Sequence, residues 1–234
     1  MIPQLRSKLI LPLLALLMLL AAWIESPLAS NMGFKFNKKL YAGFVIVQAP
    51  KRDNWISLPY NNPYPDAKKL CVACGAAGAG FTIFQLNPAT GAALVNYPCA
   101  LVAVVPLDAS RGVRIRNTGP LPANCIIVGS HDDATPLPTI LGGFTLVQAP
   151  KKENWISVPY HTTWNKAEDV CVSLGLGPGA GSVIRINPDP AVGANVVSHP
   201  CVTVINNFAI RPAEALLIRK TSAGDIVGFI PLHL

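Results

Sequence analysis

The chain contains one segment twice, 100 residues apart. Residues 43–60 read GFVIVQAPKRDNWISLPY and residues 143–160 read GFTLVQAPKKENWISVPY, and 13 of the 18 positions are identical. Small insertions fall between the later matched blocks, where loops tolerate them. These blocks include Cys71/Cys171, Asn87/Asn187, Cys99/Cys201, Val113/Leu216 and Ile127/Ile226. The sequence therefore predicts a tandem duplication of a unit of about 100 residues, which is an ordinary domain size.

The first thirty residues have the composition of a secretory signal peptide. Arg6 and Lys8 precede an apolar run from Leu9 to about Ile24, and a stretch with small residues follows up to Ser30. The run of about 16 residues is shorter than the about 20 that a membrane span needs. An uncleaved N-terminal anchor is the alternative. The predicted organisation is a signal peptide (1–30), a lead-in (31–42), a first module (43–134), a linker (135–142) and a second module (143–234).

The net charge and the distribution of apolar segments indicate where the mature protein would be located and which partners it would bind. Without Arg6, Lys8 and Glu25, 17 basic and 11 acidic side chains remain, a net charge of about +6. The basic residues form no dense block interleaved with stacking aromatics, so we expect no nucleic-acid partner. A solvated surface is the first interpretation, and loose attraction to anionic glycans or lipids is the second. No further long apolar stretch follows, so we expect no transmembrane span in the mature chain, which would be secreted, periplasmic or at the cell surface.

All six cysteines follow the predicted signal peptide, so we expect them to meet an oxidising compartment. Two pairs occupy matched positions of the repeat, whereas Cys74 and Cys125 face Leu174 and a position near Asp225 in the second copy. Cys74 and Cys125 are both present in the first copy and both absent from the second, and the simplest explanation is that they form a disulfide with each other. The predicted disulfides are Cys71–Cys99, Cys171–Cys201 and Cys74–Cys125, and the first two would each stabilise the fold by about 3–4 kcal/mol.

Cys71 and Cys74 also form a C-x-x-C motif, which is typical of redox and zinc sites. The second copy keeps only Cys171, and no second C-x-x-C or histidine pair completes a tetrahedral site. We therefore expect no metal and no cofactor at this motif.

Hydrophobic periodicity predicts an α+β fold that is mainly β, with one short helix in each module. Residues 54–60 alternate, which places Ile56, Leu58 and their matches Ile156 and Val158 on a buried face and the tryptophan and serine on the other. Helices are expected from Asp66 and over 165–175, starting at the N-cap residue Asn165 and stopping at a glycine. Further strands are expected at 44–47, 81–86, 101–105, 112–116, 125–128 and 182–186, with the arginines of 113–116 facing outward.

Residues that could carry catalysis are few. His131 lies in a Gly-Ser-His-Asp-Asp run, which is typical of a turn, because a catalytic triad is assembled from separate parts of a chain. Nothing in the spacing of His161, His199 and Asp169 supports a shared metal. The glycine runs at 75–80 and 175–181 lack the Lys and Ser/Thr of a phosphate-binding loop. We therefore expect a protein that is not an enzyme.

The strongest shared signature is Asn-Trp-Ile-Ser-(Leu/Val)-Pro-Tyr. Trp55, Tyr60, Trp155 and Tyr160 could form a surface on which glycans stack, and this is the low-ranked ligand-binding hypothesis. The favoured interpretation is that these aromatics belong to the core, because both copies need the same fold.

This signature, followed by an Ala-x-x-Leu-Cys helix and Val128-Gly129-Ser130-His131-Asp132, resembles an uncharacterised β-rich repeat module of secreted or envelope proteins of bacteria. The resemblance implies no activity and no functional residue. We therefore expect an exported, non-enzymatic structural or binding protein. A carbohydrate- or surface-binding adhesin subunit is the alternative, and a hydrolase with a site between the repeats is a distant one.

Overall fold

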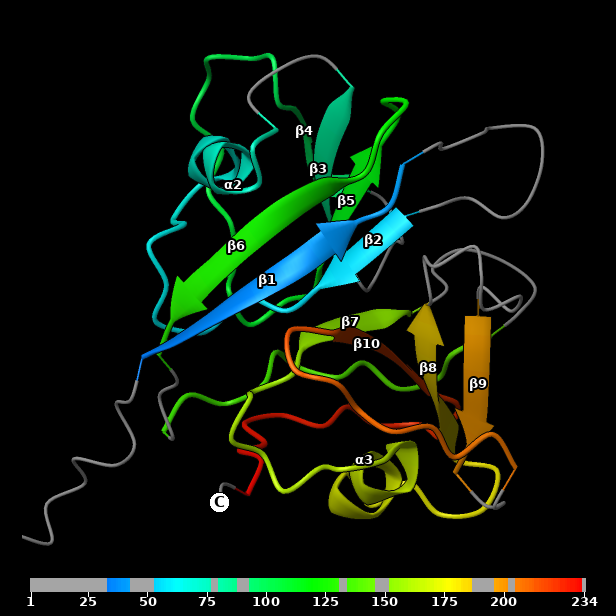
Figure 1. The fold of residues 1–234 in the computed structure, drawn as a ribbon. Coiled ribbons are helices and arrows are strands. Elements are labelled where there is room, and N and C mark those ends of the chain that lie inside the picture. The colour runs from blue at the N-terminus through cyan, green and yellow to red at the C-terminus, as the bar shows by residue number, and fades with distance from the viewer. Residues whose placement is uncertain are drawn as a thin grey trace, which may run out of the picture. The chain divides into compact units, whose positions relative to one another are not determined.

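The computed structural model describes residues 33–42, 53–76, 80–87, 93–130, 134–145, 152–186, 196–201 and 205–232. This part of the chain is mainly β, as expected, and it holds two short helices (Figure 1). The first half contains β1 (Phe34–Leu40), β2 (Asp53–Ile56), α2 (Ala67–Ala73), β3 (Phe81–Leu86), β4 (Ala93–Pro98), β5 (Val113–Asn117) and β6 (Ala123–Gly129). The second half contains β7 (Asn154–Ser157), α3 (Ala167–Ser173), β8 (Gly181–Ile186), β9 (Val196–Pro200) and β10 (Ala215–Lys220).

Two four-stranded antiparallel sheets have the same strand order. The first sheet runs β2-β5-β3-β4 and the second runs β7-β10-β8-β9. Strands from matched sequence segments therefore hold the same place in both sheets. A separate two-stranded sheet joins β1 to β6.

Each four-stranded sheet packs one face on its own hydrophobic core. In the first core α2 lies against β3 and β6, and in the second α3 lies against β8. Ile56, Leu58, Ile156 and Val158 are all buried in these cores, as their alternation predicts. Residues Gly33–Leu234 form one compact unit.

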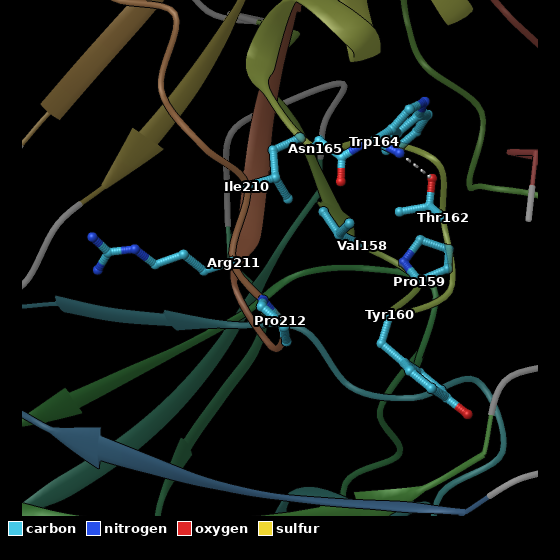
Figure 2. Close-up of a pocket in the computed structure, with 9 residues that line it drawn as sticks. All are labelled: Val158, Pro159, Tyr160, Thr162, Trp164, Asn165, Ile210, Arg211 and Pro212. Carbon is cyan, nitrogen blue, oxygen red and sulfur yellow. Dashed lines mark hydrogen bonds between the residues drawn. The ribbon is translucent and has the colours of Figure 1, made fainter. Parts of the chain in front are cut away.

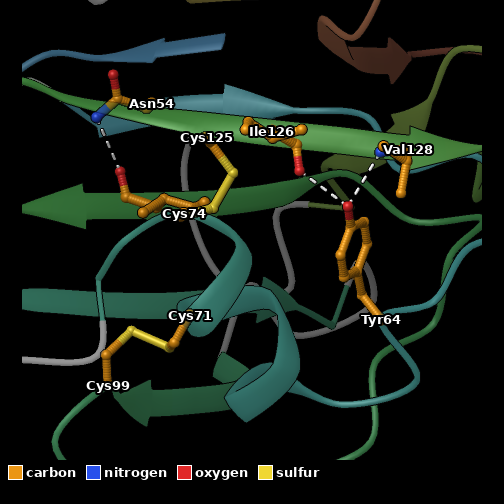
Figure 3. The surroundings of a disulfide bond; sticks show 9 residues. Asn54, Tyr64, Cys71, Cys74, Cys99, Cys125, Ile126 and Val128 are labelled. Atoms are coloured by element: carbon orange, nitrogen blue, oxygen red, sulfur yellow. Dashed lines mark hydrogen bonds between the residues drawn. A yellow bond between two sulfur atoms is a disulfide. The ribbon is translucent and has the colours of Figure 1, made fainter. Parts of the chain in front are cut away.

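Three disulfides cross-link these cores, and they are the three pairs expected from the sequence. Cys71–Cys99 and Cys171–Cys201 have Cα–Cα distances of 5.7 and 5.4 Å and tie each helix to the segment after the fourth strand. Cys74–Cys125 ties the end of α2 to β6 (Figure 3). Beside it the Tyr64 hydroxyl donates to the Ile126 carbonyl and accepts from the Val128 N–H.

The helix ends follow from local residues, with one correction. Asp66 caps α2, because its carboxylate accepts the Lys69 N–H at 2.9 Å. The predicted N-cap Asn165 is wrong, since α3 is capped one residue later at Lys166. Here Asp169 Oδ2 reaches back and accepts the N–H groups of both residues. Both helices end at the expected glycines, which adopt φ values of +61° and +63° that glycine allows without strain.

Several strands differ from the expectation. No strand forms at 101–105, although Leu-Val-Ala-Val-Val has strong β propensity, because none of the described strands pairs with this run. Conversely β1, β4 and β9 were not expected. The predicted strand 54–60 ends at Ile56, since a proline follows and the backbone pairs elsewhere. The expected strand at 44–47 lies outside the described residues.

The last matched block is also placed differently. Ile226 pairs with Ile140 as Ala123 pairs with Leu40, so Ile226 corresponds to Ala123 and not to Ile127. The sequence likeness of the two Ile-Val-Gly triplets is therefore misleading, because the insertions that precede them had already shifted the register.

Candidate functional site

The shared signature begins with an asparagine whose side chain hydrogen-bonds to the backbone of residue 41 in the first half and residue 141 in the second. Asn54 accepts the Tyr41 N–H at 2.7 Å and donates to the Tyr41 carbonyl at 3.1 Å. Asn154 accepts the Leu141 N–H at 2.7 Å and donates to the Leu141 carbonyl at 3.0 Å. Each amide also donates to a carbonyl of the adjacent strand. The structural likeness of the two halves therefore extends back to residues 41 and 141.

The tryptophans of the signature lie against each other. The rings of Trp55 and Trp155 are stacked, with centroids 3.3 Å apart and planes 5° from parallel. Only 3% and 6% of their surfaces are exposed. They are buried in equivalent places, as expected for core residues, and offer no open face on which a sugar could stack. Within the described part of the chain neither buried indole N–H has a hydrogen-bond partner.

The serines of the signature exchange hydrogen bonds across the same boundary. Ser57 Oγ accepts the Val158 N–H at 2.7 Å and donates to the Glu214 carbonyl at 2.7 Å. Ser157 Oγ accepts the Leu58 N–H at 3.2 Å and donates to the Arg111 carbonyl at 3.0 Å. Each bond therefore has a counterpart made by the matched residue of the other half.

Backbone hydrogen bonds between the two halves also occur in matched pairs. The Ser57 N–H donates to the Ala213 carbonyl at 3.1 Å, and the Ser157 N–H donates to the Ser110 carbonyl at 3.0 Å. Gly112 and its match Ala215 meet at the centre, where a Cβ on the glycine would lie 2.8 Å from the alanine Cβ. Matched residues that meet each other define a local twofold relation.

The strand face that carries the tryptophan and the serine is buried as well as the face that carries the isoleucine. The second face of β2 and β7 is covered by the other half, so all residues of both strands are buried. A third hydrophobic cluster lies on these faces, with Trp55, Trp155, Ile184, Ala215 and Leu217 as its buried members. Sequence analysis missed the role of the two serines. The available signal was a serine retained in both copies on a face that otherwise carries tryptophan.

Arginines at this boundary are paired and do not simply face outward. Arg116 Nε lies 3.1 Å from Asp53 Oδ1, and Arg219 Nη2 lies 2.6 Å from Glu153 Oε1 in the matched place. Arg114 lies 3.6 Å from Asp53 and stacks over Phe84, with 4.2 Å from guanidinium to ring centroid. Burial lowers the pKa of Arg114, and the nearby aspartate opposes this.

Charge at the next matched positions is inverted between the halves. The first half pairs Asp108 with Arg111 at 2.8 Å, and both side chains are partly exposed. The second half has Arg211 and Glu214 at these positions. Glu214 is buried, its Oε1 lies 3.7 Å from Arg185 Nε, and its Oε2 has no hydrogen-bond partner among the described residues. Burial raises the pKa of Glu214 and lowers that of Lys38, whose charges attract each other.

The signature tyrosines line two hollows in matched places. Tyr60 lines one of about 300 Å³ with Asp108 and Ser110, and Tyr160 lines one of about 220 Å³ with Thr162 and Arg211.

Neither hollow is built for a large ligand. Figure 2 shows Thr162 next to Pro159 and Trp164, while Arg211 extends away from Thr162 and Trp164. The Tyr160 ring also packs against Phe34, with ring centroids 3.8 Å apart. Ligand pockets usually measure about 300–1,000 Å³, so both hollows lie at or below this range.

Two of the four histidines, His161 and His199, lie in the described part of the chain. His199 is buried, and its Nδ1 lies 3.0 Å from the Ile205 carbonyl oxygen. The His161 ring lies against the Tyr160 ring at 3.4 Å between centroids. Among the described residues, no three His, Cys, Asp or Glu side chains come together as metal ligands. His131 and His233 lie outside the described residues.

No family model matches the chain, and neither a curated protein nor a solved structure is significantly similar to it. The resemblance to a bacterial repeat module thus stays an expectation. Neither of the two helices described has the length or apolar character needed to cross a bilayer. The disulfides are consistent with a secreted or extracellular protein.

Proposed function

We propose that the chain is an exported, non-enzymatic structural or binding protein of the bacterial envelope or extracellular space. It consists of two tandem modules that face each other about a local twofold relation, and each module supplies the cover for the other's sheet. The protein holds no cofactor and acts through its surface.

One observation carries this proposal. The residues shared by both halves are used in holding the halves together, since the tryptophans stack on each other and the serines exchange hydrogen bonds. The signature residues are buried in contacts that hold the halves together, so they are not free to bind a ligand. The function would then depend on surface residues, which differ between the halves. Disulfides support export, because they persist in oxidising compartments.

Export is tested by expressing the chain with its own N-terminus in a bacterium and fractionating the cells. We expect the protein outside the cytoplasm, starting close to Asn31, with the three disulfides found by unreduced peptide mapping. Recovery of intact Met1 in a membrane fraction would show an anchor instead. Free thiols at Cys71 and Cys74 would contradict the disulfide framework.

Glycan binding is the second candidate, and the paired tyrosine hollows are the observation that favours it. Because both tryptophans are buried, binding would depend on Tyr60 and Tyr160 alone. Titration of mono- and disaccharides, followed by NMR shifts, tests this. Shifts that Y160A removes while the fold persists would favour the adhesin, and absence of shifts in both hollows would exclude it.

A further inference from the structure

An aliphatic surface lies beside α2 and is not used by the fold. A hollow of about 520 Å³ lies beside the helix, and its lining includes Tyr64, Lys68, Lys69, Val72 and Val104. This is larger than either tyrosine hollow. We call α2 together with residues 101–104 the α2 face.

The aliphatic side chains of the α2 face are unusually open to solvent. The exposed fractions are 63% for Val72, 50% for Leu101, 82% for Val102 and 69% for Val104. Single exposed aliphatic residues are common, but Val72 and Val104 line the same hollow and Leu101 and Val102 precede Val104 in the chain, and such a group marks an interaction surface.

Two exposed lysines border these side chains. Lys68 and Lys69 lie on the same short helix, and the carboxylate of Asp66 at its start is buried and accepts the Lys69 backbone N–H. The matched helix α3 carries Glu168 and Asp169 at these two positions. The combination of basic and aliphatic residues is thus a property of α2 and not a requirement of the fold.

We propose that the α2 face binds the surface of an anionic phospholipid bilayer, with the lysines at the headgroups and Val102 and Val104 in the interface. Basic residues beside exposed aliphatic ones suit an anionic membrane surface, which attracts each charge and accepts each apolar group. The net charge of the chain has the same favourable sign.

Other occupants fit this chemistry less well. A glycan would need aromatic rings to stack on, and the exposed group here is aliphatic. Protein interfaces are enriched in aromatic residues and arginine at their centres, whereas lysine is depleted there. The proposal rests on the proposed export only in that export decides which membrane the protein would meet. Bilayer binding itself is measured on purified protein and does not depend on export. The protein could therefore be exported and not bind vesicles, or bind vesicles and not be exported, and the two results are distinguishable.

The test is co-sedimentation of the exported protein with vesicles of phosphatidylglycerol and phosphatidylethanolamine, compared with vesicles of phosphatidylcholine. The first variant, K68E/K69D, gives α2 the residues that α3 has. The second, V102S/V104S, removes the aliphatic side chains and keeps the charges. V172S is the matched control, because Val172 is 74% exposed on α3. All proteins carry the same N-terminus, and circular dichroism with the melting temperature checks each fold.

We expect binding to the anionic vesicles that weakens with added salt. K68E/K69D should lose at least about 20-fold in partition, since each lysine contributes about fivefold at an anionic surface. V102S/V104S should lose at least about tenfold, and V172S should bind like the wild type. The proposal is wrong if the protein does not bind anionic vesicles, or if either double variant binds undiminished. It is also wrong if V102S/V104S converts a dimer to a monomer in sedimentation velocity, since a second copy would then cover the face.

Discussion

Removing one signature hydroxyl should destabilise the whole protein. In S57A the Val158 N–H loses its acceptor and the Glu214 carbonyl loses a donor, both bonds being 2.7 Å long in the wild type. In S157A the Leu58 N–H and the Arg111 carbonyl lose theirs, at 3.2 and 3.0 Å. Both serine side chains lie where water has little access, with 3% and 0% of each residue exposed.

The magnitude follows from the groups left behind. A buried donor or acceptor without a partner costs about 1–3 kcal/mol. Two such groups per substitution predict a loss of about 2–6 kcal/mol in the free energy of unfolding, with S157A at the lower end because its bonds are longer. The two serines serve different backbone groups, so the double variant should lose about 4–12 kcal/mol. That is comparable to the about 5–15 kcal/mol of an ordinary protein.

Urea denaturation under oxidising conditions measures this loss, followed by tryptophan fluorescence and by circular dichroism. S110A is the matched control, because that hydroxyl bonds only to the exposed Asp108 carboxylate and its loss should cost no more than about 0.5 kcal/mol. The reasoning is refuted if S57A unfolds within about 0.5 kcal/mol of the wild type. It is also refuted if one serine matters and the other does not, because the contacts are reciprocal.

Three further outcomes follow from the same contacts. W55A and W155A should each cost about 3–5 kcal/mol and should both abolish the near-ultraviolet circular dichroism of the stacked pair, and a loss in only one variant would contradict the stack. Replacing Cys74 and Cys125 together by alanine should lower the free energy of unfolding by about 4 kcal/mol, because the bridge closes a separation of 51 residues, as urea denaturation would show. Burial raises the pKa of Glu214, so its ionisation opposes folding; this cost is absent below the unfolded-state pKa and complete above the folded-state pKa. The melting temperature of E214Q relative to wild type should therefore rise as the pH increases from about 4 to 7, and a constant difference would contradict this.

The sequence predicted the features that depend on local pattern and on comparison of its own halves. The strand Phe81–Leu86, the glycine ends of both helices and the burial of Ile56 and Leu58 follow from period and turn chemistry. The disulfide pairs follow from the joint presence and absence of Cys74 and Cys125. These inferences need only local pattern or the alignment of one half of the sequence with the other.

What the sequence did not predict depends on contacts between distant segments. β1 alternates clearly, but Lys38 holds an inward position where a core residue is expected, and the paired residues of β1 and β6 lie 83 to 95 positions apart in the sequence. The run 101–104 shows the opposite failure, since its β propensity is high but it pairs with no strand among the described residues. Periodicity does not predict the serine and tryptophan contacts. It shows only that these residues share the second face of the strand, and what covers that face depends on a sheet formed by a distant part of the chain.

The two halves provide an internal comparison that separates folding from function. Where the fold consumes a side chain, as at Trp55 and Ser57, the matched position keeps the same residue. Where the side chain lies at the surface the charge reverses, as at Lys68 and Glu168. A protein that needed both surfaces for the same partner would be expected to keep both alike. The difference between α2 and α3 therefore agrees with the proposal that α2 alone contacts a membrane, on a structure in which Trp55, Ser57 and their matches hold the halves together.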